Sequence, residues 1–259
     1  TVDLPAADVV PGSLAGDAWL GVFKSFDGGQ TWQSTLLPGY PQDKSAAGMA
    51  SPLKQFSAAA DPTVRSSTNG LFFYSGIAFN RGTNQGVVFV SRFMDLNNKE
   101  NGDVSKNTDP IKYIDTVVVD SGTSGQFLDK TWILVDSPLP GAPSCSIAVP
   151  TSPGQTTMQS IPAGKAYLLW SRFTGNGGSK IMVSTSADCG KTWSLPIKLS
   201  ESNSVNQGTI GAIDPLTHEL DIVWRRFKTS SQTDAIMFVR ASSNLKTVTK
   251  ATPIASIIP

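Results

Sequence analysis

The stretch STSADCGKTW, residues 184–193, has a second version in KSFDGGQTW, residues 24–32. Both contain the pattern Ser-x-Asp-x-Gly-x-Thr-Trp. In such a turn the Asp side chain can accept hydrogen bonds from N–H groups a few residues later, Gly permits a positive φ, and Trp covers the hairpin with a large apolar face. We therefore expect a structural brace rather than a catalytic group at the fixed positions, which are Ser25, Asp27, Gly29, Thr31 and Trp32 in one copy and Ser186, Asp188, Gly190, Thr192 and Trp193 in the other.

The rest of the chain repeats around this turn. Three segments each begin with a polar residue, a variable residue, Thr and an apolar residue, at 61–64, 129–132 and 207–210. A second strand follows in each and aligns Tyr74 with Trp170 and Trp224, which we expect to mark one buried position. A third strand leads into the turn pattern or into a degenerate relative of it, in which Asp95 or Asn244 stands in the Asp188 position. A short apolar fourth strand ends the unit, so each unit is a four-stranded meander.

Repeated four-stranded meanders are typical of β-propeller blades. The sequence therefore predicts an all-β fold built of four-stranded antiparallel blades, with about three and a half blades present. The expected ranges are a partial blade at 1–40 and whole blades at 56–119, 126–200 and 204–257. A ring needs at least four sheets, so either residues 1–18 complete a small ring or the chain is part of a longer propeller. We expect the second, a larger propeller of the six-bladed type with the missing blades on the rest of a parent chain or on another chain.

Composition excludes several function classes. The chain has 259 residues, with 21 basic and 20 acidic side chains, so no strong field attracts nucleic acid. No apolar window is long enough to span a membrane. One histidine and two cysteines leave little for a metal cluster or a serine-histidine triad, and we expect neither a bound metal nor another cofactor.

The repeated turn resembles the Asp-box, or bacterial neuraminidase repeat, of sialidase-like propellers. The resemblance implies that the turns lie on the face opposite a ligand site. In sialidases three arginines hold the sialate carboxylate, a Tyr assisted by Glu is the nucleophile, and an Asp is the acid/base. Their Arg-Ile-Pro triplet is absent here, so no catalytic residue is carried over and the catalytic set is unknown. If the chain is an enzyme, the resemblance implies a glycoside hydrolase of the exo-α-sialidase type.

Meander geometry also predicts which residues face a ligand. The starts of the first strands and the connections between second and third strands should share the face opposite the repeated turns. The candidate ligand-binding residues there are Asp61, Arg81, Asp129, Lys130, Arg172, Gln207, Arg225 and Arg226. Arg81, Arg172 and Arg226 recur once per blade and either converge on an anionic ligand or form ion pairs across the blade mouths.

The two cysteines fall at one end of one unit. Cys145 lies in an insertion between the first and second strands of the third unit, and Cys189 lies inside its repeated turn, so we predict a Cys145–Cys189 disulfide. A disulfide indicates an oxidising compartment, and we expect a secreted, periplasmic or cell-surface protein. His218 is expected to be a plain turn residue. The acidic and amide-rich stretch from Met94 to Asp109 is either a solvated insertion or a weak Ca²⁺ site.

Two functions remain open. One is a secreted sialidase-like propeller that binds or processes glycans. The other is a non-catalytic propeller that serves as a structural or protein-interaction module of a larger assembly.

Overall fold

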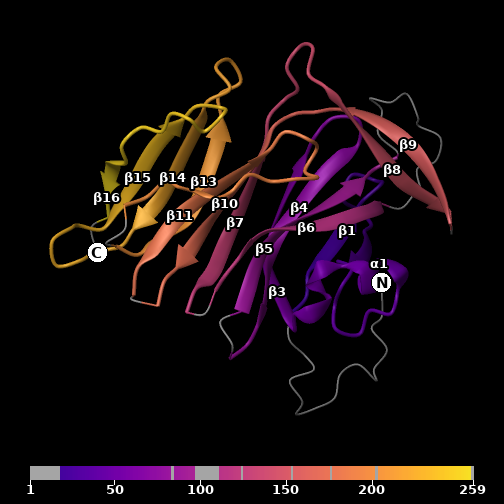
Figure 1. The fold of residues 1–259 in the computed structure, drawn as a ribbon, viewed down its shortest axis with the longest axis horizontal. Helices are drawn as coiled ribbons and strands as arrows, with labels where there is room; N and C mark the ends of the chain where they lie inside the picture. Colours follow the sequence, from indigo (N-terminus) through magenta and orange to yellow (C-terminus); the bar gives the residue numbers. More distant parts are fainter. Residues whose placement is uncertain are drawn as a thin grey trace.

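A computed structural model describes residues 18–82, 85–96, 111–123, 125–152, 154–175, 177–201 and 204–257. The chain is all-β and contains three four-stranded antiparallel sheets, which fan out side by side in Figure 1. Sheet I contains β3 (Ala58–Ser66), β4 (Leu71–Asn80), β5 (Gln85–Met94) and β6 (Lys112–Ser121). Sheet II contains β7 (Phe127–Val135), β10 (Ala166–Phe173), β11 (Ser179–Ser186) and β12 (Ile197–Lys198). Sheet III contains β13 (Asn206–Ile213), β14 (Leu220–Arg226), β15 (Ala235–Ala241) and β16 (Thr252–Ser256).

Two hairpins accompany these sheets. One consists of β1 (Gly21–Lys24) and β2 (Gln33–Leu36), and the other of β8 (Ser144–Ser152) and β9 (Gln155–Pro162), which interrupts sheet II between β7 and β10. A short helix, α1 (Ala46–Ala50), and a 3-10 turn, η2 (Pro52–Gln55), lead into sheet I. In the described residues no helix is long and apolar enough to cross a membrane.

Consecutive residues are apolar in β10 and β11 of sheet II, and because successive side chains point to opposite faces, both faces of the sheet are buried. One face, with Leu168 and Trp170, packs on sheet I, and the other, with Leu169 and Val183, packs on sheet III. These side chains are almost fully excluded from water. A third cluster fills the space between sheet I and the β1–β2 hairpin with its following helical turns. The order in space is therefore the β1–β2 hairpin, sheet I, sheet II and sheet III.

Each first strand contains a β-bulge at the same place in its sheet. In β3 the bulge comprises residues 61–62, in β7 residues 130–131, and in β13 residues 208–209. One residue of each bulge has a positive φ: 55° at Asp61, 56° at Lys130 and 70° at Gly208. A bulge bends its strand and redirects side chains, and such features gather at functional sites.

The bulges correct the expected alignment of the second strands. Trp170 and Trp224 lie opposite their bulges, whereas the residue opposite the bulge of β3 is Gly76. Tyr74 is two residues earlier, although it is also buried and also faces the preceding element of the chain. A large side chain does not fit at Gly76, because a Cβ atom there would lie 3.1 Å from the Ala60 carbonyl oxygen and 2.9 Å from the Leu20 side chain.

The two Ser-x-Asp-x-Gly-x-Thr-Trp turns have the same internal hydrogen bonds. In the turn between β11 and β12, Asp188 accepts from the backbone N–H of Thr192 at 2.9 Å, from its hydroxyl at 2.6 Å, and from the Ser186 hydroxyl at 2.8 Å. Asp27 makes the corresponding three bonds at 2.9, 2.6 and 2.9 Å in the turn between β1 and β2. The three hydrogen bonds that each Asp side chain accepts all come from its own turn, which is how a brace behaves.

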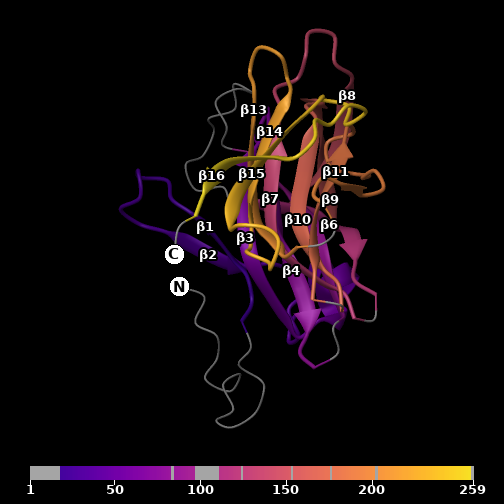
Figure 2. The same cartoon turned by 90° about the vertical axis from the view of Figure 1, so that its left-hand side faces the viewer.

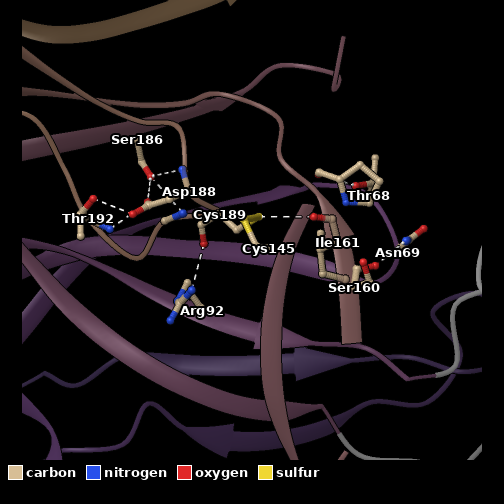
Figure 3. Close-up of a disulfide and its surroundings, with 12 residues drawn as sticks. Thr68, Asn69, Arg92, Cys145, Ser160, Ile161, Ser186, Asp188, Cys189 and Thr192 are labelled. Carbon is tan, nitrogen blue, oxygen red and sulfur yellow. Dashed lines mark hydrogen bonds between the residues drawn. A yellow bond between two sulfur atoms is a disulfide. The ribbon is translucent and has the colours of Figure 1, made fainter. Parts of the chain in front are cut away.

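Cys145 and Cys189 form a disulfide with a Cα separation of 6.3 Å, which confirms the predicted pairing. The insertion that carries Cys145 is the β8–β9 hairpin, and the disulfide fastens it to the β11–β12 turn (Figure 3). Residues of sheet I also form hydrogen bonds with this turn and with the β8–β9 hairpin. Arg92 of β5 donates to the Cys189 carbonyl at 3.2 Å, and Asn69 donates to the Ser160 carbonyl at 3.1 Å. The hairpin is thus fixed to sheets I and II together.

Candidate functional site

The three bulges meet in space. They line one pocket of about 230 Å³, whose walls are residues 61–63, 130–132 and 208–210. We call this pocket the bulge site. It joins three sheets that are far apart in sequence, and each sheet contributes the same structural feature. Four of the sequence-predicted ligand residues, Asp61, Asp129, Lys130 and Gln207, lie in the bulges or next to them.

Polar contacts connect the sheets at this pocket. The Lys130 ammonium group lies 3.4 Å from the Asp61 carboxylate, and the Thr131 hydroxyl donates to the Asp61 carbonyl at 3.1 Å. Gln207 donates from Nε2 to Asp129 at 2.9 Å. Lys130 is about half exposed, with 49% of its side chain accessible. Its ammonium group can therefore reach a ligand as well as Asp61.

The surroundings of Asp129 raise the pKa of its carboxyl group above the ordinary value. Burial raises the pKa of its carboxyl group, and a hydrogen bond with the Asp61 carboxyl raises it further, while Gln207 and Lys130 act in the opposite direction. Two carboxyl groups that share a hydrogen bond resist simultaneous ionisation, which is why the contact with Asp61 favours the protonated form of Asp129. Asp61 in the bulge site and the adjacent Asp129 therefore form a contact between two carboxyl groups at the edge of the pocket.

Two further residues complete the pocket, and the sequence did not single them out. Thr209 is 2% exposed, and its hydroxyl has no hydrogen-bond partner within the described residues. Trp132 forms an aromatic wall, with its Nε1 bonded to the Gly211 carbonyl at 3.2 Å and the Arg65 guanidinium stacked 4.6 Å from its ring centroid. A buried hydroxyl without a partner is costly, so a polar ligand atom that reaches it would be favoured.

The arginines do not converge. Arg172 forms an ion pair with Asp120 at the end of β6, and Arg225 holds Asp234 with two hydrogen bonds of 3.0 and 2.6 Å. Arg226 donates to the Thr233 carbonyl at 3.3 Å, and Arg81 stacks over Phe79. Arg172 and Arg225 therefore form ion pairs instead of facing a common ligand. The ion pair of Arg172 joins sheet II to sheet I, and that of Arg225 lies within sheet III. In the register of β10 and β11, Arg172 lies opposite Lys180 at one end of the hairpin, and Ala166 lies opposite Ser186 at the other end. Arg172 is therefore at the end of the strands away from the repeated turn.

A second pocket, of about 330 Å³, lies at the opposite ends of the strands, beside the repeated turn of sheet II. His218 lines it with a φ of 58°, and its Nδ1 lies 3.0 Å from both carboxylate oxygens of Asp136. His218 is thus a turn residue that also connects sheets III and II. Lys165 reaches the Ser243 carbonyl at 3.2 Å in the same pocket.

In the described parts of the chain, no group of three or more His, Cys, Asp and Glu side chains is arranged to hold a metal ion. Most of the stretch considered for Ca²⁺, from residue 97 onward, lies outside the described residues.

Comparison with known proteins gives weak matches only. No family model matches the sequence, and no curated protein matches it either. Among solved structures, the Hadza microbial sialidase Hz136 is similar with a TM-score of 0.48 and 12% identity, over 78% of this chain and 38% of that chain. The α-L-arabinofuranosidase Arb93A from Fusarium graminearum, solved with an iminosugar inhibitor, is similar with a TM-score of 0.47 and 13% identity, over 88% of this chain and 55% of that chain.

A mutant of the same arabinofuranosidase gives a TM-score of 0.49 and 12% identity, over 93% of this chain and 59% of that chain. The chain thus spans less than two thirds of the length of each of these structures. At these identities and TM-scores the similarity assigns no activity to this chain.

Proposed function

We propose that sheets I, II and III are blades of a β-propeller of the sialidase-like, Asp-box type, and that the chain supplies three blades and part of a fourth to a larger ring. Three features support this: the shared strand order of the sheets, the bulge repeated in every first strand, and the identical hydrogen bonds of the two repeated turns.

We further propose that the chain binds carbohydrate at the bulge site. The observation that carries this proposal is a pocket lined by the Asp61 carboxyl group, the Lys130 ammonium group and an unpartnered Thr209 hydroxyl beside the Trp132 ring. Asp129 and Gln207 are hydrogen-bonded to each other directly beside the bulges. Sugar hydroxyls are both donors and acceptors, so they suit a site in which both kinds of group are closely spaced. The aromatic wall suits the apolar face of a sugar ring.

Glycan processing is the second candidate, and the Asp61–Asp129 pair favours it. Glycosidases commonly use two carboxyl groups, one of which stays protonated and donates its proton to the leaving oxygen. Burial and the contact with Asp61 raise the pKa of Asp129, which is the direction that favours this role. We propose Asp129 as the proton donor of any hydrolysis at this site, with Asp61 as its hydrogen-bond partner.

Isothermal titration against a panel of neutral and sialylated oligosaccharides tests binding, and fluorogenic glycosides test hydrolysis. Asp129→Asn should abolish hydrolysis and weaken binding, because an amide cannot supply the same proton and changes the contact with Gln207. Asp221→Asn, on the surface of sheet III, is the matched control. Saccharide binding that is equal in both variants would exclude the bulge site.

We also propose that the protein works outside the cytosol. The disulfide supports this, because such bonds persist in oxidising compartments.

A further inference from the structure

The second pocket, beside the repeated turn of sheet II, lies between sheets II and III. On the side of sheet II it is lined by the β7–β8 connection and the residues before β10, and on the side of sheet III by the β13–β14 and β15–β16 turns. Figure 2 shows the β7–β8 connection and the β13–β14 turn at the same end of the molecule. Every lining residue belongs to the described parts of these two sheets. We call this space the turn-side pocket, and its volume of about 330 Å³ is enough for a small molecule.

Lys165 places a positive charge in the turn-side pocket. An ammonium group has three N–H donors, and two of them are used by Ser243, whose carbonyl and hydroxyl oxygens lie at 3.2 and 3.4 Å. The third has no partner among the described residues. The Tyr167 hydroxyl also donates to the Ser243 carbonyl, at 2.7 Å, so the oxygen that positions Lys165 is itself held in place. Lys165 is therefore fixed with one donor left for a negatively charged ligand.

His218 adds a hydrogen-bond acceptor. Its Nδ1 lies 3.0 Å from both carboxylate oxygens of Asp136. A carboxylate only accepts hydrogen bonds, so the ring proton lies on Nδ1 and Nε2 is the ring atom left for a ligand. The Asp136 side chain is 8% exposed, so its own charge presents little surface to the pocket.

The remaining wall of the turn-side pocket is apolar. It consists of Leu139, Pro140, Ala142, Pro143 and Ala163. Leu139 is 51% exposed, so a ligand seated against it would remove apolar surface from water. This wall suits an aliphatic group better than a sugar ring, whose hydroxyls would lose water there without gaining partners.

We propose that the turn-side pocket binds a small aliphatic carboxylate that carries a hydrogen-bond donor next to its carboxyl group. The carboxylate accepts from the free N–H of Lys165, the neighbouring donor reaches Nε2 of His218, and the aliphatic part packs on Leu139 and the prolines. Lys165 supplies one positive charge, which matches a ligand with a single negative charge.

Two sources share this chemistry. One is a 2-hydroxy acid, whose hydroxyl is the donor, and the other is an N-acylated amino acid, as at the C-terminal end of a peptide, whose amide N–H is the donor. The proposal does not depend on saccharide binding at the bulge site, because the turn-side pocket lies at the opposite ends of the strands.

Amide NMR titrations of the wild-type protein with a matched ligand series test the proposal. N-acetyl-leucine and 2-hydroxyisocaproate represent the two sources, and a Kd of about 1 mM is expected for ligands of this size. Saturable shifts at residues 139–143, 163–165 and 218 with either ligand support the proposal and identify its source. Isocaproate lacks the neighbouring donor and should bind about tenfold more weakly. N-acetyl-leucinamide lacks the negative charge and should not saturate the site.

Three variants assign the contacts. Lys165→Met keeps the apolar stem but removes the ammonium group, and should weaken binding of the acids by about tenfold or more. His218→Asn should bind 2-hydroxyisocaproate and isocaproate equally, because it lacks Nε2, while Asn tolerates the left-handed backbone at this position. Lys191→Met, at an exposed lysine of the neighbouring turn, is the control and should bind as the wild type does.

Thermal melting establishes that each variant is folded, and the ligand series on the wild-type protein decides the question if a variant is not. Failure of both N-acetyl-leucine and 2-hydroxyisocaproate to saturate the wild-type protein would overturn the proposal. Equal affinities in Lys165→Met and Lys191→Met would also overturn it, as would shifts centred on residues 61–63 and 130–132, because the acids would then bind elsewhere.

Discussion

Replacing Asp188 by Ala tests whether the repeated turn is a brace. The side chain accepts three hydrogen bonds, from the N–H and hydroxyl of Thr192 and from the hydroxyl of Ser186. Hydroxyls that lose this partner can turn to water, so the main loss is the bond from the backbone N–H. Hydrogen bonds contribute about 0.5 to 1.5 kcal/mol each, and those to charged groups about 1.5 to 3. Partial solvent exposure reduces the sum, and we expect a loss of about 1 to 3 kcal/mol of unfolding free energy.

The pH dependence has a definite sign. Burial alone would raise the pKa of Asp188, but the hydrogen bonds from Thr192 and Ser186 outweigh it and lower the pKa below the ordinary value of 3.8. A carboxyl group with a lowered pKa stabilises the fold above its unfolded pKa, and this contribution disappears as the pH falls through the folded pKa. The difference between wild type and Asp188→Ala should therefore be complete at pH 7 and shrink below pH 3.8.

Urea unfolding under non-reducing conditions, followed by tryptophan fluorescence and circular dichroism, measures this difference. Lys191→Ala is the matched control, since Lys191 is an exposed neighbour in the same turn. Asp27→Ala removes the same three bonds from a solvent-exposed turn and should have a smaller effect. An unchanged midpoint for Asp188→Ala at pH 7, or a loss no larger than that of Lys191→Ala, would refute the brace.

Three other perturbations have expected outcomes. Cys145→Ser should lower the unfolding free energy by about 3 to 4 kcal/mol, because the loop between the cysteines spans 44 residues; denaturation of the variant without reductant measures it, and an unaltered stability would contradict the loop-closure estimate. Arg92→Met should lower the unfolding free energy by about 1 to 3 kcal/mol, because the nearly buried Arg92 donates hydrogen bonds to Asp115 at 2.7 Å and to the Cys189 carbonyl. The same denaturation assay measures this, and an unchanged free energy would show that the contact between sheets I and II does not depend on Arg92. The wild-type protein should lose stability as the pH rises above 3.8, because a carboxyl group with a raised folded pKa stabilises the fold only while it is protonated, and Asp129→Asn should remove this pH dependence. Melting temperatures of both proteins from pH 4 to 7 measure the effect, and a constant difference between them would contradict it.

The strands and their order could be predicted because turn residues separate short β-branched and aromatic runs at every boundary. The β8–β9 hairpin and α1 could not, since both lie in Pro- and Ser-rich stretches that are equally typical of loops. The disulfide could be placed because both cysteines fall at one end of one unit. Repetition within the sequence therefore predicts the sheets but not the insertions between them.

The candidate site was only partly predictable. Asp61 and Lys130 adopt left-handed backbone conformations that are uncommon for residues other than glycine, and only Gly208 carries a clear local signal for the bulge. The contact that binds Arg172 comes from Asp120 of the neighbouring sheet, a partner that no sequence spacing indicates. Alignment placed Tyr74 with the two tryptophans because aromatic identity was the strongest shared signal, whereas the bulge determines the true register.

The most direct test of the account is to map a bound saccharide by chemical-shift changes in amide NMR spectra. The largest changes should cluster at residues 61–63, 130–132 and 207–210, and Asp129→Asn should weaken them. Changes centred instead on His218 and Asp136, at the opposite ends of the strands, would contradict the assignment of the bulge site as the ligand-binding face.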